Sequence, residues 1–380
     1  MSNRLRFVRS ILTYLALLVL VVISAGPLVN ADEKRQVENV QIKPLHFALM
    51  VTRSPGDLYY EPLTRFCQAV ADDLGIKLTV YYADDDRQKY AQNVELAVSR
   101  DRVDGVILQS FKGGGKKYLR IAEAFRVPLF FFNDINMMDS EDPSPYWVGD
   151  ITPNGVGAGE ALAEKLIASA RMKGLQNASG KIEMVALEGF TSSGPSLKRV
   201  QGLQRAVKNH PDVILHQIVS ANWRREEAQQ IMPGLYKRYP GLVAIWAASD
   251  SMILGVEDWA NQKGVKMGAQ LVAGGIDWAR DALVEISQEQ LEVSYGGHFM
   301  EAGWAIVMLF DRLRGSQAGT DRLHLSTQME ALDRHNVNEY LGRFGGQDWS
   351  SIDFQRFSRA YTPSLQTYDF SLRALMSQFD

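Results

Sequence analysis

Short apolar runs alternate with amphipathic stretches along most of the chain. Residues 45–51 are apolar apart from His46, which is typical of a strand buried on both faces. Residues 61–74 carry Pro62 in the first turn and apolar side chains at helical spacing, and Gly75 follows them. This second stretch therefore predicts a helix, and the same alternation continues to residue 313.

The full pattern predicts nine strands and nine helices. The strands are expected at residues 45–51, 77–82, 103–108, 127–132, 182–187, 213–219, 242–247, 270–273 and 291–295. The helices are expected at residues 61–74, 88–99, 116–125, 155–170, 197–209, 224–239, 251–263, 279–288 and 301–313. Regular alternation predicts an α/β fold with parallel sheets covered by helices on both faces. So many strands favour two doubly wound sheets in two lobes over one sheet.

The first residues have the pattern of a secretory signal. Arg4, Arg6 and Arg9 precede an apolar run over 11–23, and Ala31 closes a small-residue site. We therefore expect a signal peptide at residues 1–31 and a periplasmic mature chain. The alternative is an uncleaved anchor, although the run is shorter than the ~20 residues that a bilayer span needs. The rest of the sequence has no second long apolar run, so we expect a mature chain that does not span a membrane.

Composition and charge narrow the classes of function. Hydrophobic residues make up 46% and charged residues 22% of the 380 residues, which is the balance of a globular protein. A net charge of −3 argues against a nucleic-acid partner. The one cysteine, Cys67, cannot form an internal disulfide, and its place on an apolar helix stripe predicts a buried, inert thiol.

Motifs for catalysis, metals and cofactors are absent from the sequence. Residues 110–117 lack the first glycine and the hydroxyl of a phosphate loop, and residues 155–160 lack the last glycine of a dinucleotide fingerprint. We expect the glycines of residues 155–159 to allow close helix packing instead. The histidines lack zinc spacing, and there is no G-x-S-x-G motif. We therefore expect no cofactor, no metal and no enzyme, although a pair of catalytic carboxylates remains open.

Polar and aromatic side chains collect after the predicted strands, where parallel sheets bind ligands. The candidate ligand-binding residues are Asp57, Tyr59, Tyr60, Gln109, Asn133, Asp134, Arg199, Trp223, Ser249, Asp250, Asp277, Trp278 and His298. Aromatic rings can stack on a sugar ring, and the polar groups can bond its hydroxyls. Alternatively, the aspartates cap helices, which we favour for Asp250, and the tyrosines and tryptophans pack in the core.

Seven stretches resemble the type I periplasmic binding proteins, in the ribose/galactose-like group that includes the autoinducer-2 receptor. They are residues 54–60, 101–109, 126–134, 198–207, 247–256, 272–278 and 294–303, and the resemblance covers residues 44–314. It implies a ligand trapped between two lobes joined by three hinge crossings, near residues 147–152, 295–297 and 323–328. The lobes would be residues 44–150 plus about 297–325, and 151–296 plus about 326–340.

The resemblance also implies roles for single residues. Tyr59, Tyr60 and Trp223 stand at stacking positions, Gln109 at an amide position, and Arg199 and Asp277 at the family's arginine and aspartate. Four positions depart from the family pattern: Asn133 and Asp134 replace an Asp-Arg pair, Ser249 replaces an asparagine, and Gly297 replaces a glutamine. The ligand need not be ribose, galactose or even a simple sugar.

The last stretch, residues 341–380, is rich in aromatic residues and weakly periodic. We expect this extension to pack on a lobe or across the hinge, because exposing so many aromatic rings is unfavourable. A partner-binding surface is the alternative.

These observations predict a periplasmic solute-binding protein. It would capture a carbohydrate-like ligand as a monomer and deliver it to an ABC permease. The alternatives are a sensory protein that presents its closed form to a transmembrane receptor, and an exported enzyme on the same scaffold. A sugar-responsive repressor is excluded, because the N-terminus has no helix-turn-helix.

Overall fold

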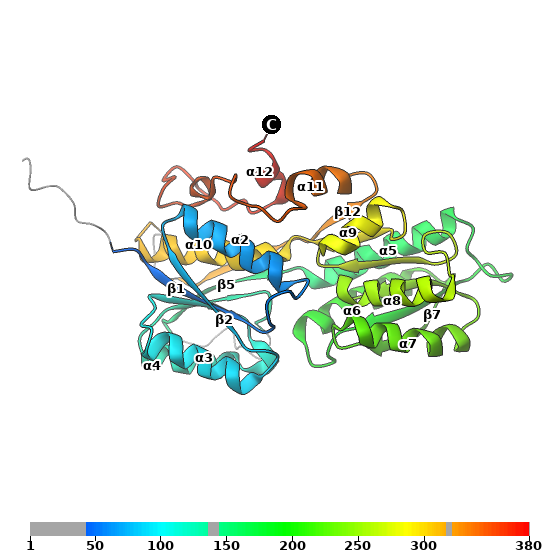
Figure 1. Cartoon of the computed structure of the whole chain (residues 1–380), viewed down its shortest axis with the longest axis horizontal. Coiled ribbons are helices and arrows are strands. Elements are labelled where there is room, and N and C mark those ends of the chain that lie inside the picture. The colour runs from blue at the N-terminus through cyan, green and yellow to red at the C-terminus, as the bar shows by residue number, and fades with distance from the viewer. Residues whose placement is uncertain (1–42, 136–143, 317–320, 380) are drawn as a thin grey trace, which may run out of the picture. The chain divides into compact units, whose positions relative to one another are not determined.

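The computed structural model describes residues 43–135, 144–316 and 321–379. The predicted signal peptide, residues 1–31, lies outside these ranges. Within them, twelve strands form two six-stranded sheets (Figure 1). The prediction of two separate sheets in two lobes is therefore confirmed.

The first sheet is parallel throughout and has the order β2-β1-β3-β4-β5-β11. Its strands are β1 (His46–Val51), β2 (Lys77–Tyr82), β3 (Gly105–Leu108), β4 (Leu129–Phe132), β5 (Trp147–Pro153) and β11 (Leu323–Thr327). Side chains of β1 alternate between two faces, as strand geometry requires. Phe47 and Leu49 join the core that contains α2 (Tyr60–Asp73) and α10 (Glu301–Leu313). Ala48 and Met50 join the core of α3 (Arg87–Ser99) and α4 (Gly115–Ala124).

The second sheet has the order β7-β6-β8-β9-β10-β12. Its strands are β6 (Ile182–Glu188), β7 (Val213–Ser220), β8 (Leu242–Ala247), β9 (Val272–Ile276), β10 (Val293–Gly296) and β12 (Glu330–Asp333). Its helices are α5 (Gly155–Met172), α6 (Gly194–Asn209), α7 (Arg225–Arg238), α8 (Asp250–Lys263) and α9 (Arg280–Ser287). Strand β12 runs antiparallel to β10, so the expectation of a purely parallel sheet is wrong at this edge. The chain reaches β12 directly from β11 in the other sheet rather than through a crossover helix.

The chain passes between the two sheets three times. It leaves the first sheet after β5, returns after β10 into α10, and leaves again between β11 and β12. Helix α10 packs on β3, β4 and β5, which places it with the first sheet. These passages form the three-crossing hinge that the resemblance implies.

Most predicted elements agree with the structure to within a few residues. Strands β5 and β11 lie where only crossings were expected, and β12 was not predicted, because each of these strands is short or mixed in polarity. Strand β9 lies later than residues 270–273, since it contains Gly274 and Gly275, which have low strand propensity. Cys67 is fully buried, as predicted, and burial raises the pKa of its thiol.

Helices α5 and α6 approach closely through glycine. A Cβ atom on Gly159 would lie 2.0 Å from the Arg199 carbonyl oxygen, and one on Gly202 would lie 2.0 Å from the Val156 carbonyl oxygen. The glycines therefore serve helix packing, as the sequence predicts. Because Arg199 belongs to α6, this contact also fixes the backbone that carries its side chain.

Residues 337–379, here called the C-terminal segment, contain α11 (Val337–Phe344) and α12 (Leu372–Met376). Trp349 and Phe354 are buried against Phe66 of α2, with ring centroids 5.2 and 5.3 Å apart. Helix α11 packs on α9 of the second lobe (Figure 1). The expected boundary at residue 341 falls inside α11.

Gly159→Ala should destabilise the protein by about 1–3 kcal/mol, because the methyl group must displace backbone on α6. Gly234→Ala is the matched control, since its Cβ would meet nothing within 4 Å on α7. This control should gain about 0.5–1 kcal/mol from helix propensity. Chemical denaturation measures both values, and equal stabilities for the two variants would contradict the packing argument.

Candidate functional site

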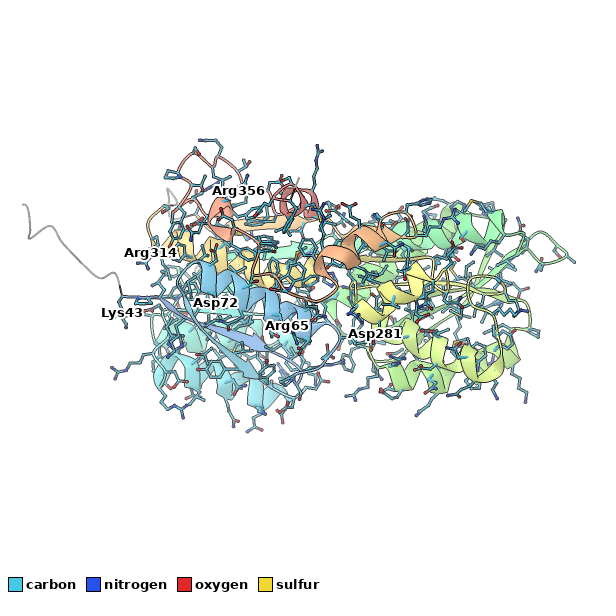
Figure 2. The ribbon with its side chains drawn as sticks, turned by 45° about the horizontal axis from the view of Figure 1, so that its top comes forward. Lys43, Arg65, Asp72, Asp281, Arg314 and Arg356 are labelled. Atoms are coloured by element: carbon cyan, nitrogen blue, oxygen red, sulfur yellow. The ribbon has the colours of Figure 1, made fainter. Side chains whose placement is uncertain are left out.

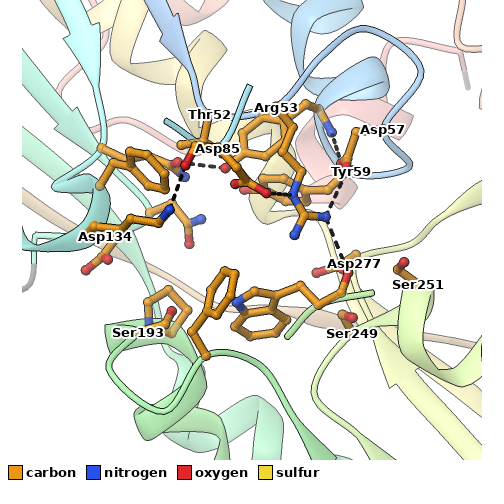
Figure 3. Close-up of a pocket in the computed structure, with 18 of the residues that line it drawn as sticks. Thr52, Arg53, Asp57, Tyr59, Asp85, Asp134, Ser193, Ser249, Ser251 and Asp277 are labelled. Carbon is orange, nitrogen blue, oxygen red and sulfur yellow. Dashed lines mark hydrogen bonds and ion pairs between the residues drawn. The ribbon is translucent and has the colours of Figure 1, made fainter. Parts of the chain in front are cut away.

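A cavity of about 380 Å³ lies between loops of the two lobes. Figure 3 shows Arg53, Tyr59 and Asp134 of the first lobe on one side, facing Ser249 and Asp277 of the second lobe. Its walls mix aromatic rings, carboxylates, hydroxyls and guanidinium groups. This composition is typical of a site that orients a small polar molecule between apolar surfaces.

The structure brings eleven of the thirteen predicted residues to this one cavity. They are Asp57, Tyr59, Tyr60, Gln109, Asn133, Asp134, Arg199, Trp223, Ser249, Asp277 and His298. The other two, Asp250 and Trp278, do not line it.

Arg199 stands at the centre of the second-lobe wall, with 3% of its surface exposed. Its Nη1 donates to the carbonyl oxygen of Ala248 at 2.6 Å and to Asp277 Oδ1 at 3.4 Å. Its Nη2 lies 2.9 Å from His298 Nε2, and its Cζ lies 5.5 Å from the centre of the Trp223 ring. The guanidinium is therefore held in one orientation from several directions, which a planar, donor-only group favours.

His298 follows the hinge crossing at β10 and is buried. Burial lowers the pKa of His298, and the positive charge of Arg199 adds to this effect, whereas Asp277 opposes it. His298 Nε2 faces both the Arg199 guanidinium, which can only donate, and Asp277 Oδ1, which lies 3.3 Å away. The ring also stacks on Tyr59, with centroids 5.1 Å apart.

The first-lobe wall is built on the loop after β1. Asp57 Oδ1 accepts the backbone N–H groups of Tyr59 and Tyr60 at 2.9 and 3.1 Å, which fixes the start of α2. Tyr60 then donates its hydroxyl to Gln109 Oε1 at 2.8 Å. The two tyrosine rings meet edge to face at 5.0 Å. Asp57 thus organises the loop, while the rings form the surface.

Unusual backbone conformations turn side chains toward the cavity. Asn133, Trp223 and Asp277 have positive φ angles of 57°, 61° and 138°, which is uncommon for residues other than glycine and concentrates at functional sites. The Trp223 ring lies so close to Gly189 that a Cβ there would come within 1.9 Å of it. Glycine at position 189 is therefore needed to seat this ring.

Arg53 connects the two lobes beside the cavity. It pairs with Asp57 at 3.0 Å and Asp85 at 3.3 Å in its own lobe. It also donates to the carbonyl oxygens of Trp223 at 3.3 Å and Asn222 at 3.4 Å in the other lobe. These bonds need the lobes to be close together, so they belong to a closed arrangement.

Four buried polar atoms on the cavity residues have no hydrogen-bond partner among the described residues. They are Tyr59 Oη, Asn133 Oδ1, Arg199 Nε and His298 Nδ1. Leaving a buried polar atom unpaired costs about 1–3 kcal/mol. All four atoms belong to residues that line one cavity, although the atoms themselves are covered by protein.

Asp250 and Trp278 support the site from behind. Asp250 Oδ2 accepts from Ala279 N at 2.8 Å and from Ser294 Oγ at 2.7 Å, while Ser249 caps α8. The expectation that Asp250 caps the helix it opens is therefore wrong. Trp278 is turned away from the cavity and donates Nε1 to the carbonyl oxygens of Ser294 and Glu330.

Sequence reasoning missed several residues of the cavity wall. Arg53 comes directly before the loop that was singled out, and Phe111 and Lys112 follow Gln109. Phe190 lies between β6 and α6. The Lys112 ammonium lies 4.9 Å from the centre of the Phe111 ring and 5.9 Å from that of Phe190. Extending the strand-end rule by three residues beyond Gln109 would have included Phe111 and Lys112.

The described residues contain no group of three or more His, Cys, Asp or Glu side chains that could hold a metal ion. In the same part of the chain, every helix is too short or too polar to cross a membrane.

Comparison with known proteins gives one consistent result. A family model described as "periplasmic binding protein domain" matches residues 47–317. The galactofuranose-binding protein of Escherichia coli is 21% identical over 57% of this chain and 66% of its own length. A D-apiose import binding protein of Actinobacillus succinogenes is 24% identical over 62% of this chain and 72% of its length. A crystal structure of a periplasmic sugar-binding protein from Pseudomonas fluorescens is 29% identical, with a TM-score of 0.77 over 87% of this chain and 99% of that one.

Stability should fall as the pH rises from about 4 to about 8. Burial, with the nearby Asp277 carboxylate, raises the pKa of Asp250 to about 8. The folded chain then holds a proton that the unfolded chain has lost, so each pH unit costs at most ~1.4 kcal/mol. Asp250→Asn should flatten this slope, because the amide resembles the protonated acid. Thermal unfolding across this range provides the measurement, and parallel curves for both proteins would contradict the assignment.

Proposed function

Because this chain belongs to the periplasmic binding protein family, we propose that it captures a sugar or closely related polyol between its lobes and delivers it to an ABC importer. One observation carries this proposal: carboxylates, hydroxyl groups, guanidinium groups and aromatic rings from both lobes line a single cavity. A polyol offers hydroxyl groups that both donate and accept, so one ligand can bond the donors and the acceptors of this wall together. Tyr59 and Trp223 supply flat apolar surfaces for the C–H faces of its ring.

The arrangement supports binding by closure. Tyr59 and Asn133 come from the first lobe, whereas Arg199 and Trp223 come from the second. A ligand can bond both sets only when the lobes are together, so it favours the closed form by its difference in affinity for the two forms. An importer would then recognise the closed outer surfaces.

We also propose the division into lobes that the resemblance implies, with the extension beginning at α11. The packing of α10 on the first sheet and the place of β12 in the second sheet support this division. The proposal includes export to the periplasm, a monomeric state and release of the ligand without chemical change.

A thermal-shift screen of the purified protein is the direct test of the ligand class. The sugars named for the relatives, galactofuranose and apiose, are the first candidates, followed by other pentoses, hexoses and polyols. A true ligand stabilises by about 2.7 kcal/mol at a hundredfold excess over its dissociation constant. Recovering that ligand unchanged supports transport, whereas turnover would favour an enzyme and overturn the proposal.

Trp223→Ala and Asp277→Ala should each weaken binding of the identified ligand about tenfold or more, the effect of losing one buried contact. The Trp223 variant loses a stacking surface, and the Asp277 variant loses both a cavity carboxylate and a partner of Arg199. Tyr236→Ala is the control, because this ring is 37% exposed on α7 and does not line the cavity. Isothermal titration calorimetry compares the three variants, and unchanged affinity in both cavity variants would refute the site.

A further inference from the structure

The C-terminal segment is fastened to the first lobe by a buried carboxylate. Asp311 of α10 is fully buried. It accepts from Ser358 Oγ at 2.5 Å, the Arg359 and Ala360 backbone N–H groups at 2.7 and 3.0 Å, and the Tyr368 hydroxyl at 2.9 Å. Each of these donors belongs to the segment, so one side chain holds four of its residues between positions 358 and 368. Stacking of Phe370 on Trp304 of α10, with centroids 4.5 Å apart, adds an apolar anchor beside it.

The same segment is fastened to the second lobe. Arg280 Nε of α9 donates to the Gly345 carbonyl oxygen at 2.9 Å, and Leu372 N donates to Glu330 Oε1 on β12 at 3.1 Å. Tyr340 of α11 packs on Trp278, with ring centroids 5.1 Å apart. Figure 2 labels Asp72 on α2, Asp281 on α9 and Arg356 on the segment, and shows the segment running past both helices.

Between these anchors the segment covers the hinge itself. Phe370 and Leu372 line a space of about 20 Å³ together with Gly296, Thr327 and Gln328, where the chain crosses between the sheets. This space is too small for a ligand other than water. A change in the angle between the lobes must therefore disturb the packing of the segment on one lobe, the other lobe, or the crossings.

The second-lobe anchor also reaches the candidate site. Trp278 follows Asp277 directly, and both residues have positive φ angles, 138° and 60°. Trp278 is held by Tyr340 on one side and by the Ser294 and Glu330 carbonyl oxygens on another. The segment thereby supports the strained turn that aims Asp277 at Arg199.

We propose that the C-terminal segment is a strap that sets the angle between the lobes and positions the Asp277 turn, with Asp311 and Tyr340 as its positioning residues. The effect on lobe angle is independent of what the cavity binds. The effect on ligand affinity rests on the proposed function.

Spin labels on the exposed positions Gln92 of α3 and Glu226 of α7 report the distance between the lobes. Cys67 is buried and should not be labelled. Asp311→Asn weakens the first-lobe anchor, because it places an amide among four donors. The double variant Arg280→Ala/Glu330→Ala removes the exposed anchors on the second lobe. Arg334→Ala is the control, since Arg334 Nε donates to the ring of the neighbouring His335.

Pulsed electron resonance without ligand should show one narrow distance distribution for the parent and for Arg334→Ala. Both anchor variants should broaden it toward longer distances. If Asp311→Asn does not fold, the exposed double variant decides the outcome alone. Distributions identical to the control in a folded double variant would overturn the strap.

Tyr340→Ala should weaken binding of the identified sugar about tenfold, and Tyr340→Phe, which keeps a ring against Trp278, should restore the affinity. Equal affinity for Tyr340→Ala and the parent would overturn the positioning role. If the parent itself binds no sugar of the screen, the proposed function fails, and the distance measurement still judges the strap.

Discussion

The buried guanidinium of Arg199 is the constraint on which the site depends. A full positive charge with 3% exposure is tolerated only when it is paired and hydrogen-bonded. Asp277, the Ala248 carbonyl oxygen and the His298 ring provide those partners from three different strand ends. The glycine contact between α5 and α6 fixes the backbone from which the side chain extends. The packing of α5 on α6 and the geometry of the site therefore both involve Arg199, so a change in either one alters the other.

The remaining polar groups are arranged around that charge. His298 is kept neutral by burial and by Arg199, so its ring can stack on Tyr59 without adding a second cation to the wall. Asp250 lies one layer further back, where its raised pKa keeps the acid protonated near neutral pH. The cavity thus presents a limited net charge, which suits an uncharged polyol better than an ion.

Much of this arrangement follows from the sequence. Alternating strands and helices predict two covered sheets, and side chains after parallel strands meet at one edge, which is why eleven chosen residues share a cavity. Asp250 and Trp278 do not line the cavity, although each is next to a residue that does. Only the local turn decides which of two neighbouring side chains points inward. At Asp277 and Trp278, consecutive positive φ angles send one side chain forward and the other back. Arg53 and Phe190 were missed because their place depends on how far a loop reaches toward the other lobe, and local spacing does not encode that distance.

The bridge made by Arg53 has a consequence for the ionic environment. Dissolved ions can reach the ion pairs that Asp85 makes with Arg53 and with the half-exposed Arg224. Added salt therefore weakens the attraction in these pairs, since the Debye length is about 10 Å at 0.1 M ionic strength. The Arg199 group is shielded from those ions by its burial. Salt concentration should therefore control the lifetime of the closed form, whereas ligand selectivity depends on charges that are buried away from solvent.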